Sequence, residues 1–370
     1  MRRKQIKMAS TRIDPRFNRQ LQPAAGKKST NNNTIKEEIP GLIRVYEDGR
    51  VERPPIIPTV PCTSPAAAAG GVTSTDAVID GSSNLWARVY VPAVNGYCRS
   101  SYNYKLPVLV YFHGGGFCVG SAAWSCYHSF LSGLAGEAGC VIFSVNYRLA
   151  PEHRLPAAYD DGLRALAWIT SQDRSSQHWW SRRCNLSTGV FLAGDSAGAN
   201  IAYNVARTLF SSSSSSSSKL SYIQGLILIQ PFFGGETRTP SEKNTHDMSP
   251  NSPLTLSAAD TYWRLSLPFG ANRDHPFCNP LAKVREPRLL LPVPAIVCIA
   301  ETDVLRDRSL EFCDAVSRAA GTVVVGGKKA AVEAIVYRGV GHAFHVLERS
   351  AVARIRAQEM VSHIKRFVHQ

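Results

Sequence analysis

The sequence predicts an α/β protein built on a mostly parallel central sheet with helices on both faces. Short apolar runs without polar alternation recur along the chain, as in strands that are covered on both faces. Stretches with helical spacing separate these runs. A G-x-S-x-G motif, Gly194 to Gly198, lies where one apolar run ends and a helical stretch begins. The chain has 370 residues, of which 44% are hydrophobic, so it can form one large core.

The core strands are predicted from residue 106 onward. Helical stretches lie between them, as the crossover connections of parallel strands require. The predicted strands are 106–111, 140–146, 190–193, 226–229, 295–299 and 334–337, and the predicted helices are 123–137, 159–172, 197–210, 308–320 and 350–368.

The first 36 residues differ from the rest of the chain in charge. They hold ten Lys and Arg against one acid, Asp14, which is +9 of the net +14. So polar a stretch cannot bury enough apolar surface to fold, and it lacks the amphipathic pattern of a transit peptide. We expect residues 1–36 to be a disordered basic tail and residues 37–370 to be a single domain. An organelle transit peptide is the less favoured alternative, and Met8 is an alternative start.

Two segments of the domain interrupt the alternation of strands and helices. Residues 39–51 indicate a strand, a turn at Asp48-Gly49 and a second strand, followed by a proline-rich extended loop. Residues 232–290 are rich in Pro, Asn and Ser, with short apolar patches. Because open α/β sheets bind ligands beyond the carboxyl ends of their strands, we expect lid elements from about residues 37–60 and 232–290.

Two further stretches have a simple interpretation. Residues 84–92 alternate like a strand with one solvated face. Ser211 to Ser218 form an unbroken serine run between the helix at 197–210 and the next strand. We expect an expanded surface loop there, because loop length costs stability only slowly.

Composition and charge exclude several classes of protein. No apolar stretch reaches the ~18 residues of a membrane span. No apolar core follows the first basic residues, so we expect no secretory signal. The positive charge is concentrated in the tail and does not indicate nucleic-acid binding. The nine cysteines form no C-x-x-C pair and no metal spacing, and the glycines at 114–116 precede no Lys-Ser/Thr. We therefore expect no metal, no cofactor and a cytoplasmic protein, with the nucleus as an alternative location.

The G-x-S-x-G motif predicts a reactive serine, Ser196. An apolar run precedes the motif and a helical stretch follows it, which is the strand, sharp turn and helix that place such a serine. Gly194 and Gly198 allow the strained turn that lifts the hydroxyl clear of the sheet. The same five-residue pattern also arises by chance, so the prediction depends on the remaining parts of the site.

A glycine string follows the predicted strand at 106–111. A backbone without β-carbons can turn its N–H groups toward a developing oxyanion, and the residue after the serine supplies a further N–H. The string starts at His113, and the predicted donors are Gly114, Gly115, Gly116 and Ala197. A merely flexible loop is the alternative, but three glycines in a row cost folding entropy, which favours a function.

The base is expected on a loop after a late strand, and the acid that orients it before that. His342 lies between glycine-rich residues after the strand at 334–337, and His345 is the alternative base. Histidines 363 and 369 lie on the final helix or tail and are less suitable. Asp303 directly follows the strand at 295–299, whereas Asp307 fits a first-turn helix acid. The order Ser196, Asp303, His342 is that of α/β-hydrolases.

These motifs together resemble the hormone-sensitive-lipase-like branch of the α/β-hydrolases. The strings are His113 to Phe117, Tyr147 to His153, Gly194 to Gly198 and Gly341 to Phe344. The stretch Val45 to Arg53 is similar to the plant carboxylesterase family, and the resemblance covers roughly residues 37–370.

The resemblance implies an α/β-hydrolase fold with an N-terminal cap. It implies a carboxylesterase that acts on small-molecule esters through an acyl-enzyme on Ser196, with a triad of Ser196, Asp303 and His342. It implies oxyanion donors at Gly115, Gly116 and Ala197, and an architectural role for Tyr147 to His153, which would brace the loops of the site.

Two alternative functions follow from the same resemblance. Gibberellin receptors are similar in fold but lack the catalytic histidine, and some flavonoid dehydratases use the triad with a changed oxyanion loop. This chain has His342 and an intact His113-Gly114-Gly115-Gly116 string. We therefore rank an esterase first, a hormone-binding receptor second and a dehydratase third. The natural substrate, its acyl chain length and the oligomeric state are left open.

Overall fold

The computed structural model describes most of the chain from residue 34 onward. The described residues are 34–64, 71–93, 105–172, 178–187, 189–211, 222–244, 252–282, 291, 293–319, 324–325, 328–329 and 331–370. The predictions for residues 1–33 and for the serine run after Ser211 lie outside them.

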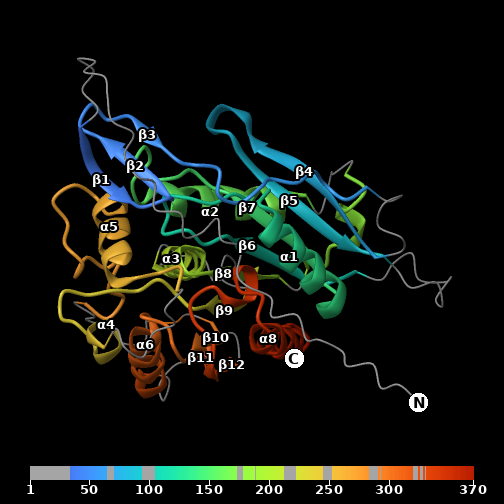
Figure 1. Cartoon of the computed structure of the whole chain (residues 1–370). Coiled ribbons are helices and arrows are strands. Elements are labelled where there is room, and N and C mark those ends of the chain that lie inside the picture. The colour runs from blue at the N-terminus through green and yellow to red at the C-terminus, as the bar shows by residue number, and fades with distance from the viewer. Residues whose placement is uncertain are drawn as a thin grey trace, which may run out of the picture.

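The central sheet has eight strands in the order β13-β10-β9-β8-β6-β7-β5-β4 (Figure 1). The six strands from β13 to β7 are parallel, whereas β5 pairs antiparallel with both β7 and β4. This confirms the predicted α/β-hydrolase sheet. The strands are β4 Val72–Asp80, β5 Leu85–Pro92, β6 Val108–Phe112, β7 Val141–Asn146, β8 Val190–Asp195, β9 Ile223–Ile229, β10 Ala295–Ala300 and β13 Val332–Tyr337.

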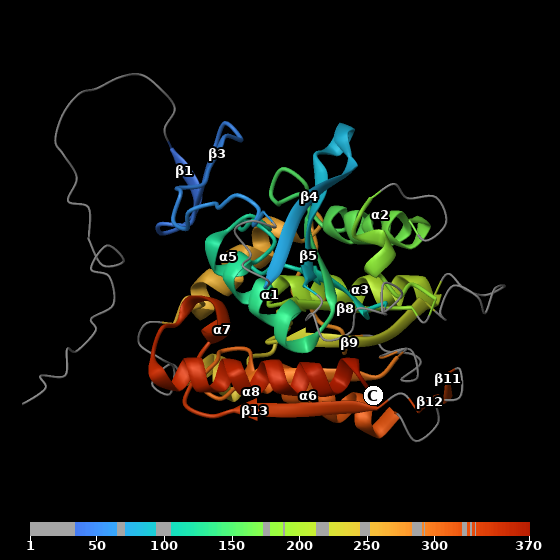
Figure 2. The same ribbon diagram turned by 90° about the vertical axis from the view of Figure 1, so that its right-hand side faces the viewer.

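Helices cover both faces of this sheet. Helices α1 (Ser125–Ala138) and α8 (Ala351–Val368) pack on one face and stand in front of the sheet in Figure 2. Helices α2 (Ala157–Ser171), α3 (Ala197–Ser211) and α6 (Arg306–Ala319) pack on the other face. The five predicted helices are therefore present, each within a few residues of its expected bounds.

Each central strand contributes to both hydrophobic cores. In β6, Leu109 and Tyr111 belong to the core under α1 and α8, whereas Val108, Val110 and Phe112 belong to the core under α2 and α3. Because successive side chains of a strand point to opposite faces, a strand buried on both sides needs an uninterrupted apolar run. This is the physical basis of the pattern seen in the sequence.

The N-terminal segment folds as a small antiparallel sheet of β1 (Ile35–Ile39), β2 (Ile43–Tyr46) and β3 (Val51–Glu52). Two expectations need correction here. The segment has three strands where two were predicted. The tail boundary at residue 36 lies too far along the chain, because Ile35 is already paired with Tyr46 in the ladder.

The described part of the segment 232–290 contributes two helices, α4 (Pro240–Lys243) and α5 (Leu256–Ser266). Helix α5 lies against β1 (Figure 1). The Arg264 guanidinium pairs with the Glu37 carboxylate at 2.8 Å. The two segments expected to form lid elements therefore meet. The sequence analysis placed no strand at β4, whose polar residues and edge position conceal its pattern. The remaining elements are the short strands β11 (Val324–Val325) and β12 (Lys328–Lys329), helix α7 (Phe344–Leu347) and two 3-10 helices, η2 (Gly81–Ser83) and η3 (Ser181–Arg183).

Within the described residues, no helix has both the length and the apolar character needed to cross a bilayer.

Candidate active site

The predicted serine turn lies between β8 and α3. Ser196 has a φ of 53°, a left-handed conformation that is strained for a residue with a side chain. A β-carbon on Gly198 would lie 1.9 Å from the carbonyl oxygen of Phe112, and one on Gly194 would lie 2.4 Å from the Gly198 backbone. The helix thus approaches β6 so closely that only glycine fits at these two positions.

The structure brings Ser196, His342 and Asp303 together in one hydrogen-bonded chain. The Nε2 atom of His342 lies 3.0 Å from the hydroxyl oxygen of Ser196, and Nδ1 lies 2.8 Å from Asp303 Oδ2. A carboxylate can only accept, so Nδ1 donates and Nε2 is left to accept from the serine. All three residues are less than 8% exposed. A neutral imidazole held in this tautomer is suited to take a proton from the serine.

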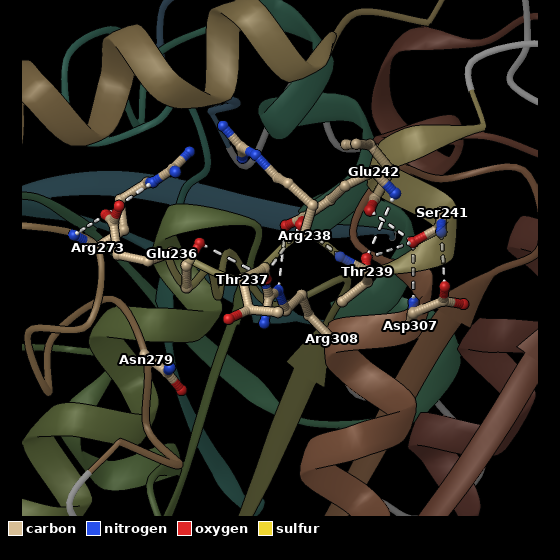
Figure 3. A network of polar contacts seen from close by, with 12 residues as sticks. Glu236, Thr237, Arg238, Thr239, Ser241, Glu242, Arg273, Asn279, Asp307 and Arg308 are labelled. Carbon is tan, nitrogen blue, oxygen red and sulfur yellow. Dashed lines mark hydrogen bonds and ion pairs between the residues drawn. The ribbon is translucent and has the colours of Figure 1, made fainter.

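Asp303 and its rival Asp307 have different partners. The second carboxylate oxygen of Asp303 accepts the N–H of Leu305, which fixes the carboxylate toward the histidine. Asp307 instead accepts the N–H of Ser241 and pairs with Arg306, as Figure 3 shows for the Ser241 contact. Asp307 is thus used in holding α4 against the start of α6.

A polar network joins α4 and the residues before it to the start of α6 (Figure 3). Helix α4 has a capping box, in which Thr239 and Glu242 satisfy each other's backbone N–H groups. The Ser241 hydroxyl donates to the carbonyl of Val304, directly after Asp303, at 2.9 Å. The buried Arg308 guanidinium binds Glu242. The turn from β10 into α6 is therefore held from outside the sheet by the segment after β9.

The three alternative histidines, His345, His363 and His369, have other surroundings. His345 is buried, packs edge-on against Phe130, and neither ring nitrogen has a hydrogen-bond partner among the described residues. Burial lowers the pKa of His345 to about 3. The ring of His363 contacts the Tyr337 hydroxyl, and that of His369 contacts the Ala138 carbonyl. His342 is the histidine that the fold sets against Ser196.

The glycine string after β6 adopts a conformation that requires glycine at two positions. Gly115 and Gly116 have φ values of 113° and 57°. A β-carbon on Gly115 would lie 2.1 Å from the Val119 carbonyl oxygen, and one on Gly116 would lie 2.3 Å from the Tyr262 ring of α5. The loop is therefore tightly enclosed, and α5 packs directly on it. The two lid segments, residues 37–60 and 232–290, are together called the cap below.

One predicted oxyanion donor needs correction. The N–H of Gly114 donates to the Tyr127 hydroxyl at 2.8 Å and to Asp195 Oδ1 at 3.0 Å. That N–H is already used and is not available to a substrate. By contrast, no hydrogen bond recorded for the described residues uses the N–H of Gly115, Gly116 or Ala197. These three stay the candidate donors, with Ala197 at the N-terminus of α3.

Asp195 is a functional candidate that the sequence analysis missed. Its buried carboxylate accepts from the Tyr111 and Tyr127 hydroxyls at 2.8 and 2.9 Å, in addition to the Gly114 N–H. Burial raises the pKa of Asp195 to about 6, although these hydrogen bonds act in the opposite direction. The carboxylate thus ties the serine turn to the start of the glycine loop. An acid at the end of an otherwise apolar strand was the available signal.

Gln230 was also missed. Its carboxamide donates to the Gly341 carbonyl at 3.1 Å and accepts the Ala343 N–H at 2.7 Å, so it holds the backbone on both sides of His342. Gln230 is 1% exposed and has a φ of 47°. No sequence pattern predicts this role of Gln230, because a glutamine after a strand can have many different partners.

His113 and Tyr147 contact each other at the start of the glycine loop. Its ring stacks on Tyr147 with centroids 4.3 Å apart, and the Tyr147 hydroxyl donates to the His113 carbonyl at 2.8 Å. Burial lowers the pKa of His113 to about 4, so the ring is neutral at neutral pH. This agrees with the bracing role that the resemblance implies for Tyr147.

The described residues contain no group of three or more His, Cys, Asp or Glu side chains arranged to hold a metal ion. Eight cysteines in that part of the chain are free thiols.

Comparisons with known proteins bear on this site. A family model described as alpha/beta hydrolase fold matches residues 109–346. The chain is 43% identical to "Probable carboxylesterase 6" of Arabidopsis thaliana, covering 92% of this chain and 94% of that protein. It is 37% identical to a gibberellin receptor of the same plant, covering 67% of this chain and 70% of the receptor.

Among solved structures, an esterase of Pyrobaculum calidifontis superposes with a TM-score of 0.62 at 26% identity, covering 80% of this chain and 84% of the esterase. The chain therefore belongs to the alpha/beta hydrolase fold family and, within it, to the plant carboxylesterases, hydrolases that act on ester bonds.

Proposed function

We propose that this protein is a serine carboxylesterase that hydrolyses small-molecule carboxylic esters through an acyl-enzyme on Ser196. The observation that carries the proposal is the chain of contacts from Ser196 through His342 to Asp303, at 3.0 and 2.8 Å. The three groups have the roles of nucleophile, base and orienting acid.

In the first half of the reaction, His342 Nε2 takes the proton of Ser196 as its Oγ attacks the ester carbonyl carbon. The carbonyl oxygen becomes an oxyanion, and the N–H groups of Gly115, Gly116 and Ala197 stabilise it. Collapse of this intermediate breaks the bond to the alcohol oxygen. The imidazolium returns its proton to the leaving alkoxide, which departs as the alcohol.

In the second half, His342 takes a proton from a water molecule that attacks the acyl carbon. A second oxyanion forms at the same donors and collapses, and Ser196 leaves with the proton from His342. The Asp303 carboxylate orients His342 and stabilises the imidazolium that forms twice in each cycle.

The cap forms the substrate side of this site in our proposal. Tyr262 of α5 packs on Gly116, and the neighbouring Trp263 stacks on Phe232 with centroids 4.5 Å apart. Phe117, next to Gly116, joins the same aromatic cluster. Residues 37–60 and 232–290 then act as the lid and pocket wall that select the ester.

A hormone receptor is the second candidate, because a gibberellin receptor is among the relatives of the chain. A binder needs a pocket but no proton acceptor, whereas His342 is held against Ser196 by both Asp303 and Gln230. This favours turnover over binding alone.

The test is a panel of p-nitrophenyl esters with acyl chains from two to twelve carbons, extended with phenolic esters and lactones. We expect hydrolysis of the shorter esters and labelling of Ser196 by a fluorophosphonate. Ser196→Ala should lower kcat by about 10⁴ to 10⁶-fold with an unchanged circular dichroism spectrum. Near-normal turnover in that variant would rule out Ser196. Tight binding of a gibberellin without hydrolysis of any ester would favour the receptor.

A further inference from the structure

Arg53, directly after β3, joins the N-terminal segment to the turn after the glycine string and to the Tyr147 to His153 stretch through one side chain. Its Nε donates to the carbonyl of Cys118 at 2.6 Å, and Nη2 donates to the carbonyl of Ala150 at 2.9 Å. Nη1 and Nη2 also bind the two carboxylate oxygens of Glu152, at 2.7 and 2.5 Å. The N-terminal segment is thereby attached to the glycine loop and to the loop between β7 and α2.

The Cys118 carbonyl belongs to the turn that carries the candidate oxyanion donors. The carbonyl of Gly115 accepts the N–H groups of both Cys118 and Val119, which closes a turn over residues 115–119. The carbonyl of Phe117 accepts the N–H of Ala150 at 2.9 Å. The two carbonyls that Arg53 binds therefore lie on the two sides of this junction, and the guanidinium spans it.

A glycine-rich loop needs such an external brace. Gly115 and Gly116 have few conformational restraints of their own, so the contacts around them must hold their N–H groups in place. A misplacement of about 1 Å in a catalytic group can cost about 100-fold in rate. The planar guanidinium offers several donors in a rigid fork, which a lysine cannot reproduce.

The exposure of the contacts indicates where the effect of Arg53 lies. The Arg53 side chain is 26% exposed and that of Glu152 is 44% exposed. An ion pair so open to water adds little to folding stability. The carbonyl contacts are the less exposed ones, and they act on the position of the loop.

We propose that Arg53 is a positioning residue for the oxyanion loop, so that the N-terminal segment serves oxyanion stabilisation as well as forming a lid. This rests on the proposed esterase function. Arg53 itself touches neither Ser196 nor His342 in the recorded contacts, and it acts through the backbone of residues 115–118.

The test compares Arg53→Ala and Arg53→Lys with the full-length wild type on p-nitrophenyl butyrate. For Arg53→Ala we expect kcat to fall by about 10- to 100-fold with KM within about threefold. A trifluoromethyl ketone, which forms a tetrahedral oxyanion on the serine, should lose affinity by the same factor as kcat/KM. The kcat and the inhibitor affinity of Arg53→Lys should lie between those of Arg53→Ala and the wild type. Ethylguanidinium at sub-denaturing concentration should restore part of kcat in Arg53→Ala only.

Arg366→Ala is the matched control, because Arg366 lies on α8, outside the lid segments, and its guanidinium pairs with Glu333 of β13. It should keep kcat and trifluoromethyl ketone affinity within about threefold. Glu152→Gln should also stay close to the wild type, because it leaves both carbonyl contacts in place.

Normal kcat and inhibitor affinity in the Arg53 variants would overturn the proposal, as would a loss confined to KM. If Arg53→Ala fails to fold, Arg53→Lys carries the same test. A wild type that hydrolyses no ester would instead overturn the proposed function. Turnover that depends on Ser196, combined with normal Arg53 variants, overturns only the role of Arg53.

Discussion

The two sides of the proposed active site are held in place by different means. On the side of the chemistry, Ser196 directly follows β8 in the middle of the sheet, and Asp303 lies in the turn between β10 and α6. On the side of the oxyanion and the substrate, the glycine loop is held by side chains from elsewhere, including Tyr127, Tyr147 and Arg53.

This difference teaches where substitutions should act. The turn after β10 is held by α4, and β8 and β10 themselves are packed in the sheet, so a change in the N-terminal sheet of β1 to β3 leaves Ser196 and Asp303 in place. A braced loop instead transmits changes in its braces to the site. The N-terminal sheet can therefore tune the oxyanion and the substrate without disturbing the serine and its base.

The largest contrast is expected between the two aspartates after β10. Asp303→Asn should lower kcat by about 10⁴-fold, because the asparagine amide stabilises the wrong tautomer of His342. Asp307→Asn should lower it less than about threefold, since Asp307 binds Ser241 and Arg306. Steady-state kinetics of the two variants on one ester measures the difference. Equal losses would mean that the acid is shared or wrongly placed.

Substitutions at Gln230, which holds the backbone around His342, should have an intermediate effect on kcat. Gln230→Glu keeps an acceptor for the Ala343 N–H but loses the donor to Gly341, and Gln230→Met loses both. We expect kcat to fall by about 10-fold and 100-fold respectively, with KM nearly unchanged, because the base is misplaced. Gln172→Glu, at the end of α2, is the control. If Gln230→Met turned over normally, His342 would be held by Asp303 alone.

How far the sequence predicts these features depends on their physical origin. The strands β6 to β10 follow from apolar runs, since burial on both faces leaves a local pattern. Ser196, Asp303 and His342 follow from their places after strands and from family motifs. Asp195 and Gln230 act through contacts with residues far along the chain, and such contacts have no local pattern. The prediction that the Gly114 N–H is an oxyanion donor was wrong for the same reason, because that N–H is bound by Tyr127 and Asp195.

The free energy of unfolding should depend on pH through two buried histidines, His113 beside the glycine loop and His345 after the base His342. Burial lowers the pKa of His113 to about 4 and of His345 to about 3. Each stays neutral in the fold but gains a proton when unfolded, so the free energy of unfolding falls as the pH drops below about 6.5 toward 4. Asp195, whose pKa is raised to about 6, acts in the opposite direction below pH 6.

Urea unfolding at several pH values should show this slope, at up to ~1.4 kcal/mol per pH unit for each histidine. His345→Leu should flatten the curve by about one proton, since its ring nitrogens have no recorded partners to lose. His363→Leu is the comparison, because His363 is a partly buried histidine of α8 whose ring contacts the Tyr337 hydroxyl. A curve unchanged by His345→Leu would show that this ring is protonated in the fold.

The smallest effect is expected from the basic N-terminal tail. Ladder pairing begins at Ile35, so a deletion that ends at residue 33 leaves β1, the Glu37 to Arg264 pair and Arg53 intact. Activity and the ester chain-length profile should stay within about twofold of the full-length chain, because a charged, polar stretch has little to pack. A deletion that ends at residue 60 removes all three features and should alter both kcat and selectivity. Equal profiles from the two deletions would mean that the N-terminal sheet serves neither as a lid nor as a brace, and the comparison between the two sides of the site would fail at its cap.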